Sequence, residues 1–523
     1  MAPVTKGDQP GDPAVLGARY SGLGKEEPRV PNTGYPVPSE ARVASSEPQV
    51  ASREPRVATS EPRVASSEAR VASSEPQAAS SEPQAASSEP RVAALLSQQW
   101  YWYYVLALLT ICYVANVADR SQVLAASLQA IKREFNATDA QLGILSGLPF
   151  AIFYSFLGIP LAAWADRSSR RNVLAWSCAL WSAATGACGM ALNFGMLFGA
   201  RVFTAIGEAG GSPPSHSLIS DYFPKLKRGT AFSIYALAVP IGTAIGAAVG
   251  GWGTQHIGWR QTFYLVGFPG LALALLVRLT VIEPPRGYAD FGGKAPAKAR
   301  TPPIREVLSF MFRRSSFLHL SLAAGLHSVV WYASGAFNNA FFQRSHAMSA
   351  SQAGYWIGFF SIVGGVGTFA GGFLADRLSK SRNDRRWYMW VPGIATLLCV
   401  PFQFAAYLAG NVSMALPMFG AMQFMAAVFF GPSFAMTQAI ATLRMRSVAT
   451  SLLLLLQTLI GQGIGPWLAG YISDYLRPSM GAASLRYSLV IVGLVNIWAA
   501  AHYMIGARSL RQDLEGTEKL ANV

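Results

Sequence analysis

Four charged residues stand inside otherwise apolar segments of this sequence: Asp119 and Arg120 in one segment, and Arg201 and Glu208 in another. Of the fifteen carboxylates after residue 97, only Asp119 and Glu208 lie well inside such segments. Arg201 and Glu208 are separated by about two helical turns, so both side chains point to one face of a helix. A charge in hydrocarbon is costly and is usually retained where it lines a cavity or relays a proton.

These charges predict ion pairs between two membrane helices. At about 1.5 Å per residue, Glu208 lies near the bilayer middle, and Asp119, Arg120 and Arg201 lie roughly 7–9 Å towards the outer side. Burial disfavours an ionised carboxylate and a neighbouring arginine favours it. A movement that separates Asp119 or Glu208 from its arginine would therefore let it take up a proton. The alternative is a static ion pair that only fixes helix packing.

Motifs for enzymatic chemistry are absent from the sequence. It has no HExxH, GxSxG or GxxxxGK[ST] segment and no Cys/His pairing, and its four cysteines lie in apolar segments without metal-ligand spacing. We therefore predict a protein that is not an enzyme and has no cofactor or metal. The net charge of +15 does not indicate nucleic-acid binding, because the basic residues lie in short turns between apolar segments.

The composition predicts an all-α membrane protein. The chain is 51% hydrophobic and 13% charged, against about 25% charged in soluble domains. A membrane helix needs about 20 apolar residues. The sequence offers twelve such segments, near 101–128, 141–163, 172–193, 195–219, 229–252, 260–282, 316–342, 352–375, 388–409, 412–438, 447–470 and 485–507.

A polar connection divides these segments six and six. We expect a disordered repeat tail, two six-helix bundles and two polar segments: 1–97 (tail), 98–282 (first bundle), 283–315 (cytoplasmic linker), 316–508 (second bundle) and 509–523 (cytoplasmic C-terminal tail). The tail repeats SSEP(R/Q)(V/A)A, whose prolines and lack of large apolar residues exclude a coiled coil. Its role stays open.

Basic residues concentrate in the turns after the even-numbered segments, which predicts that both termini face the cytoplasm. Two of these turns resemble each other, LAAWADRSSRR at 161–171 and GGFLADRLSKSR at 371–382. An acid there can face a helix N-terminus, and arginines can reach Asp221 or backbone carbonyls. We predict a conformational latch from Asp166, Arg167, Arg170, Arg171 and Asp221, with Asp376, Arg377 and Lys380 in the second half. A plain topological anchor explains these arginines equally well.

Two further patterns concern packing and a cavity. Glycines at four-residue spacing (Gly242, Gly246, Gly250; Gly461, Gly465) allow close helix approach. Polar and aromatic residues in apolar helices could line a substrate cavity, although each alone fits a satisfied interhelical hydrogen bond. The cavity candidates are Tyr154, Trp331, Asn338, Asn339, Gln423 and Gln457.

The paired D-R turns and the six-plus-six plan resemble the major facilitator superfamily, whose halves rock about a shared site. The segments from Asn116 to Arg171, Arg201 to Gly229 and Trp259 to Gly287 resemble its spinster-like branch. Ala162 and Ser169 replace the glycines usual in the first turn motif.

The resemblance implies a secondary transporter working by alternating access, with the acids and arginines of segments one and four as its coupling site. The implied partners are protons and an amphipathic molecule such as a lysolipid or sphingoid phosphate. Organic anions or drugs are the alternative substrates, and a non-transporting sensor is a rival of another class. We expect a monomer in a bacterial inner membrane. Substrate identity, direction and stoichiometry stay open.

Overall fold

The computed structural model describes residues 94–291, 303–442 and 445–521. All regular elements in those ranges are helical, and no β-strand occurs among them. The predicted repeat tail lies outside the described residues except for its last four positions. The described helices all belong to one compact unit.

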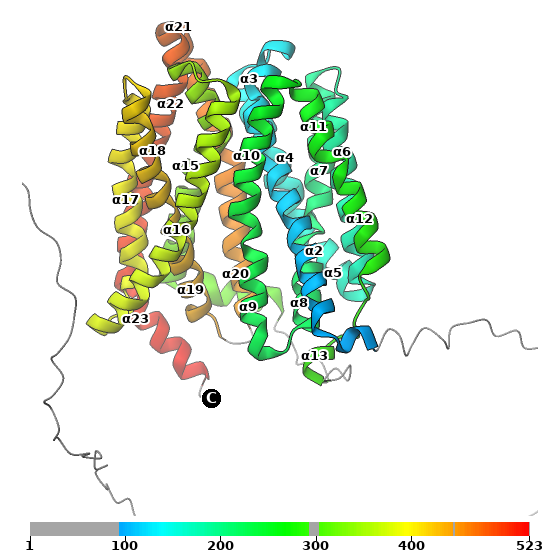
Figure 1. The fold of residues 1–523 in the computed structure, drawn as a ribbon. Helices are drawn as coiled ribbons and strands as arrows, with labels where there is room; N and C mark the ends of the chain where they lie inside the picture. Colours follow the sequence, from blue (N-terminus) through cyan, green and yellow to red (C-terminus); the bar gives the residue numbers. More distant parts are fainter. Residues whose placement is uncertain (1–93, 292–302, 443–444, 522–523) are drawn as a thin grey trace, which may run out of the picture. The chain divides into compact units, whose positions relative to one another are not determined.

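The first half makes six passages between the two ends of the bundle (Figure 1). Several passages are broken into consecutive helices, and two contain a π-helical turn. The first three passages are α2 (Gln99–Val117), η1 (Ala118–Val123) and α3 (Leu124–Phe135); α4 (Asp139–Pro149), η2 (Phe150–Tyr154) and α5 (Ser155–Arg167); and α6 (Arg170–Gly189). The next three are α7 (Phe194–Ala209) and α8 (Ser212–Tyr222); α9 (Lys225–Ala236) and α10 (Ala238–His256); and α11 (Trp259–Gly267) and α12 (Pro269–Thr280).

The second half repeats this plan after two short connecting helices, α13 (Tyr288–Phe291) and α14 (Ile304–Phe312). Its first three passages are single helices: α15 (Ser315–His346), α16 (Ala350–Arg382) and α17 (Trp387–Leu408). The last three are α18 (Val412–Ala427) and α19 (Phe430–Ile440); α20 (Arg446–Leu456), η3 (Gln457–Gln462) and α21 (Gly463–Met480); and η4 (Gly481–Ala483), α22 (Ser484–Gly493) and α23 (Val495–Ala521).

The prediction of an all-helical membrane protein is confirmed, and the passages lie where the apolar segments are. The main differences are at C-terminal ends, where α16, α21 and α23 continue past the predicted 375, 470 and 507. These extensions are polar, and contacts with neighbouring helices hold them: Asp513 Oδ2 on α23, for example, accepts a hydrogen bond from the backbone N–H of Ser316 at 2.9 Å. The predicted domain boundaries stay a prediction.

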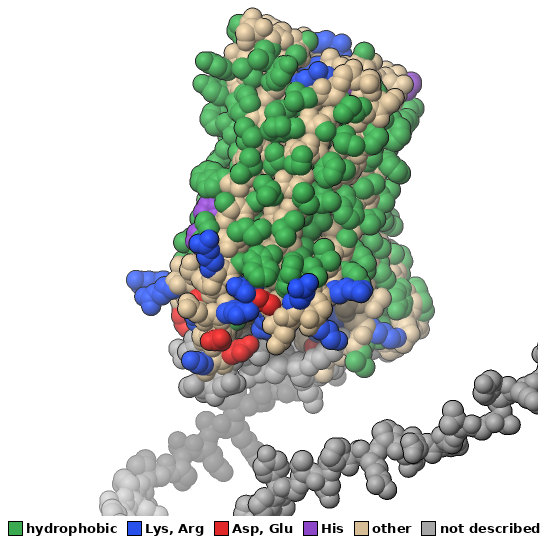
Figure 2. Space-filling model, turned by 90° about the vertical axis from the view of Figure 1, so that its left-hand side faces the viewer, with side chains coloured by type: hydrophobic (Ala, Val, Ile, Leu, Met, Phe, Trp, Pro, Cys, Tyr) green, Lys and Arg blue, Asp and Glu red, His purple; other side chains and the backbone are tan. Residues whose placement is uncertain are grey.

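The outer surface of the described unit is apolar between two polar ends. Figure 2 shows hydrophobic side chains over most of one face, with Lys and Arg gathered towards one end. Large exposed side chains such as Phe369 (74% exposed) and Trp498 (60% exposed) suit contact with lipid chains rather than water. We call the end that carries Arg167–Arg171, Lys225–Arg228 and Arg377–Arg386 the basic end.

The glycine ladders pack helices within each half. A Cβ on Gly246 would lie 2.6 Å from Cα of Ala118, so α10 approaches η1 closely. Gly465 has the same relation to Val329 of α15, at 3.1 Å from its Cα and 2.3 Å from its carbonyl oxygen. Each ladder therefore fixes the position of one helix that bears polar residues at the centre of its half.

Candidate functional site: buried charges in the first half

Two ion pairs cross between η1 and α7. Arg201 Nη1 lies 3.7 Å from Asp119 Oδ1, and Arg120 Nε lies 3.6 Å from Glu208 Oε2. The side chains of Arg201 and Glu208 are 0% exposed, that of Asp119 is 3% exposed and that of Arg120 is 21% exposed. Each acid thus faces an arginine of the other helix, and Arg120 has the most exposed side chain of the four.

Hydrogen bonds satisfy only part of this cluster. Thr185 Oγ1 of α6 donates to Asp119 Oδ2, and Arg201 Nη2 donates to the carbonyl oxygen of Arg120. Among the described residues, Asp119 Oδ1 and both oxygens of Glu208 accept no hydrogen bond. A buried polar atom left without a partner costs about 1–3 kcal/mol, and more if charged. The two carboxylates are therefore held chiefly by the charge of the facing arginines.

The π-helical turns position these side chains. η1 carries Asp119 and Arg120, and η2 carries two rings beside the guanidinium groups. Cζ of Arg120 lies 4.1 Å from the ring centroid of Tyr154 and 4.9 Å from that of Phe150, and Cζ of Arg201 lies 4.9 Å from the Phe150 ring. Such cation–π contacts contribute about 0.5–2 kcal/mol each. π-helical turns occur often at functional sites because they displace side chains from regular helical register.

The structure separates the predicted cavity residues. Tyr154 lies against the guanidinium of Arg120. Asn338 and Asn339 of α15 are buried. Asn338 accepts a hydrogen bond from Tyr407 Oη of α17, which matches the interhelical alternative, whereas Asn339 accepts one from Gln343 Nε2 within α15. The other three differ from one another: Trp331 is 37% exposed, Gln423 is half-buried, and Gln457 is 5% exposed with no hydrogen-bond partner for Nε2 among the described residues.

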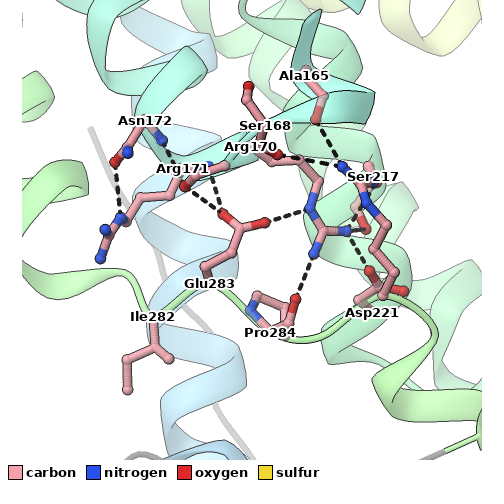
Figure 3. Close-up of polar contacts among 12 residues, drawn as sticks. Ala165, Ser168, Arg170, Arg171, Asn172, Ser217, Asp221, Ile282, Glu283 and Pro284 are labelled. Atoms are coloured by element: carbon pink, nitrogen blue, oxygen red, sulfur yellow. Dashed lines mark hydrogen bonds and ion pairs between the residues drawn. The ribbon is translucent and has the colours of Figure 1, made fainter. Parts of the chain in front are cut away.

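A second cluster lies at the basic end of the first half and centres on Arg170 (Figure 3). The Arg170 guanidinium donates to Glu283 Oε1 at 2.7 Å, to Pro284 O at 2.7 Å, to Ser217 Oγ at 3.0 Å and to Asp221 Oδ2. Glu283 Oε2 also accepts from the backbone N–H of Arg171 at 2.8 Å, at the N-terminus of α6. This cluster ties α6 and α8 to the segment that follows α12.

Arg170 and Asp221 were predicted from the sequence, but Glu283 was missed. Its position in the sequence could have indicated it, because Glu283 is the first carboxylate after the sixth apolar segment and two prolines follow it directly. Arg167 is exposed, Arg171 Nη1 donates to Val281 O at 3.3 Å, and the side chain of Asp166 lies outside the described part of the chain.

The matching turn of the second half differs. α16 continues through it to Arg382, whereas α5 ends at Arg167 and α6 begins at Arg170. Asp376, Arg377 and Lys380 are exposed or half-buried, and Asp376 accepts a hydrogen bond from Tyr388 Oη.

In this turn of the second half, the residue at the centre of the ion pairs is Asp384 and not the predicted Asp376. It pairs with Nη2 of Arg386 and of Arg511, each at 2.8 Å. The hydrogen bond from Arg386 is the main reason that the pKa of Asp384 is lowered to about 2. The sequence similarity of the two turns therefore does not extend to their contacts.

A third cluster, also missed from the sequence, joins the two halves at the end opposite the basic end. Asp139 is 1% exposed, and Arg344 donates to its two oxygens at 2.7 Å each. Lys132 Nζ also contacts Asp139, and Ser473 Oγ donates to it at 2.8 Å. Asp474 accepts the backbone N–H of Asp139 at 3.0 Å, at the start of α4. Two further polar contacts between the halves lie near this end: Arg344 Nε donates to Gln129 Oε1 at 2.8 Å, and the backbone N–H of Ser351 donates to Gln255 Oε1 at 3.1 Å.

The geometry defines a class: two six-passage halves with buried charges at the centre of one are features of a rocking transporter. Residues 109–466 match the Major Facilitator Superfamily, and the chain belongs to that family. It is an integral membrane protein of many passages, and its family and fold are those of transporters, not of enzymes.

Within the superfamily, the chain belongs to the spinster-like branch. It is 32% identical to a crystallised bacterial homologue of the human lysosomal transporter Spinster in an inward-facing, unoccupied conformation, with 80% of this chain and 99% of that chain covered and a TM-score of 0.72. It is 25% identical to the sphingosine-1-phosphate transporter SPNS2 of Mus musculus over 80% of this chain and 79% of that protein. An MFS-type efflux pump of Mycolicibacterium smegmatis is 28% identical, with 76% of this chain and 91% of the pump covered.

Proposed function

We propose that this chain couples proton movement to the transport of an amphipathic small molecule, such as a lysolipid or sphingolipid-like phosphate. The observation that carries the proposal is the pair of buried, crossed ion pairs Arg120–Glu208 and Arg201–Asp119. A carboxylate in such a place gains a proton when its arginine leaves and loses the proton when the arginine returns.

The coupling step lies in η1. Both ion pairs belong to the first half, so rigid-body rocking of the halves alone would leave them unchanged. A π-helical turn contains one extra residue, and its conversion to α-helix would rotate the preceding or following side chains by about 100°. That rotation would move Asp119 and Arg120 relative to α7 and exchange their partners. The close contact of Gly246 with Ala118 places η1 where the packing of α10 can drive the conversion.

Arg120 is the group proposed to contact the polar head of the substrate. It is the only member of the cluster with substantial exposure, 21%, and its guanidinium lies against the Tyr154 and Phe150 rings. An anionic head could compete with Glu208 for it, which would link substrate binding to protonation of that acid. Neutral residues such as Gln457 and Trp331 in the second half suit the apolar body.

The relatives favour two substrate classes. One is named a sphingosine-1-phosphate transporter, which supports the lipid phosphate, and another is named an efflux pump, which supports the alternative of organic anions or drugs. The basic end supports cytoplasmic termini, with the bundle closed towards the opposite side by the Asp139 cluster. A bacterial inner membrane and a monomer complete the proposal.

The Arg170 and Asp384 clusters are proposed as the conformational latches of the basic end. Each ties together helix ends within one half, so that the half moves as a body. The proposed bundles span 98–282 and 316–508, and each cluster also recruits a residue just beyond its bundle, Glu283 in the first half and Arg511 in the second.

The test is transport by the purified full chain in proteoliposomes with an imposed pH gradient, with lysolipids compared against organic anions. Asp119→Asn and Glu208→Gln should each reduce pH-driven accumulation at least about tenfold, which corresponds to ~1.4 kcal/mol of lost coupling. Exchange of substrate at equal concentrations should continue, because the neutral side chains mimic the protonated acids. Glu134→Gln is the matched control, since Glu134 pairs with Arg260 but is 43% exposed. Unchanged pH dependence in both variants would refute proton coupling by this cluster.

A further inference from the structure

We infer that α14 binds the phosphate-bearing headgroup of an anionic membrane lipid, in a groove where Arg305 and Arg313 supply the positive charge. The inference is independent of the transported substrate. It concerns the connection between the halves, which the buried charges of the first half do not involve.

One side of α14 is fixed to the second half. Val307 and Met311 are one turn apart, and both are 0% exposed. They belong to an apolar cluster that also contains Phe317 of α15, Met445 before α20 and Leu514 of α23. This packing fixes the rotation of α14 about its axis, and therefore the directions in which its remaining side chains point.

The remaining circumference of α14 is divided into an apolar and a basic side. At about 100° per residue, Ile304, Leu308 and Phe312 share a stripe next to the buried one. Ile304 is 57% exposed and Phe312 is 42% exposed. Arg305 and Arg313 lie on the other side. A helix with an exposed apolar stripe beside a cationic one is the pattern of segments that lie at a membrane surface.

The basic side of α14 opens onto a groove of about 740 Å³. Arg305, Ser309, Phe310, Arg313 and Arg314 line it together with a single acid, Glu306, so the charge of its walls is positive. Arg314 is already engaged, since its Nη1 lies 3.8 Å from Asp513 Oδ1 and its Cζ lies 4.9 Å from the Phe310 ring. In the described part of the chain, no carboxylate forms an ion pair with Arg305 or Arg313.

Two such guanidinium groups beside a hydroxyl are suited to a phosphate diester. The exposed apolar stripe selects the source of that phosphate. A free anion would gain nothing from Ile304 and Phe312, whereas a lipid would place its chains beside them and its headgroup at the arginines. The basic end, where α14 lies, is also the end proposed to face the anionic leaflet.

The test places a fluorophore beside the groove of the full chain. The four cysteines of the sequence are all buried, so Ser315→Cys, at an exposed residue next to the groove but outside its lining, provides a single accessible thiol. The labelled protein is incorporated into phosphatidylcholine nanodiscs that contain a minor fraction of quencher lipid, either phosphatidylglycerol or phosphatidylcholine. We expect the phosphatidylglycerol quencher to reduce the fluorescence several-fold more than the phosphatidylcholine quencher does. Arg305→Gln with Arg313→Gln should abolish that preference, since each arginine near the surface is worth roughly a fivefold change.

Three outcomes decide the matter. Arg377→Gln with Lys380→Gln removes the same charge from positions at the same end, and it should leave the preference unchanged. An equal loss in this control pair would mean general attraction to a charged surface and would overturn the site. So would equal quenching by the two lipids in the unsubstituted protein, or complete reversal of the preference by inorganic phosphate, which would indicate a small-anion site. Arg305→Lys with Arg313→Lys should restore most of the preference.

Discussion

At the centre of the first half, Asp119, Arg201 and Glu208 are buried and charged, whereas Asn338 and Gln457 of the second half are buried and neutral. Asp119, Arg201 and Glu208 are at most 3% exposed. Asn338 on α15 and Gln457 on η3 are similarly buried. Among the described residues, the Tyr407 hydroxyl, which donates to Asn338, is the one ionisable group at hydrogen-bond distance from either of them. A neutral amide can be satisfied by one neighbour, whereas a buried charge demands a partner of opposite sign. The contrast teaches that the buried charges at the centre of the bundle belong to the first half, whereas the second half contributes neutral amides there.

The same contrast holds at the basic end. Arg170 is 1% exposed and bridges two acids, but Asp384 pairs with arginines that are 32% and 57% exposed. The first half is thus stabilised by a buried ionic centre, and the second by a salt-screened one.

The largest expected effect comes from removing the buried centre. Arg170→Met leaves Glu283 and Asp221 without their common partner, so we expect a loss of about 3 kcal/mol in the free energy of unfolding. Lys380→Met, at the matching position of the second half, should change it by less than about 0.5 kcal/mol. Thermal unfolding of the two variants in detergent measures both values. Equal losses would show that the two turns are equivalent after all.

An intermediate effect is expected at the contact that positions η1. In Gly246→Val, the added side chain would collide with the backbone of Ala118, so we expect a cost of about 2 kcal/mol and slower transport. Gly372→Val on α16 is the control, because a Cβ there meets no atom within 4 Å. If both variants were equally stable and active, the packing of α10 on η1 would not matter to function.

The smallest effect is a pH dependence of the second half. The folded-state pKa of Asp384, about 2, lies below the value of about 3.9 expected for an unfolded chain. The stabilisation is therefore present above about pH 4 and is lost as the pH falls towards 2. Asp384→Asn should be less stable than the unsubstituted protein by at most about 1 kcal/mol at neutral pH, and this difference should vanish in acid. A difference that persists or grows in acid would contradict the assignment.

The twelve passages and the four central charges were predictable because they depend on local properties. An apolar segment of sufficient length must form a helix in a bilayer, since its backbone groups have no other hydrogen-bond partners there. An acid or arginine within such a segment is conspicuous for the same reason. The similarity of the two D-R turns was less informative, because α16 continues as a helix where the first half has a turn.

The sequence by itself determined which residues must avoid lipid and on which helices they lie. Only the tertiary structure decided their partners: Asp119 with Arg201, Glu208 with Arg120, Arg170 with Glu283, and Asp139 with Arg344. Hydropathy and helical periodicity reach over a few turns, but these partners are tens to hundreds of residues apart. Their meeting depends on how glycines and π-helical turns set the approach and rotation of whole helices.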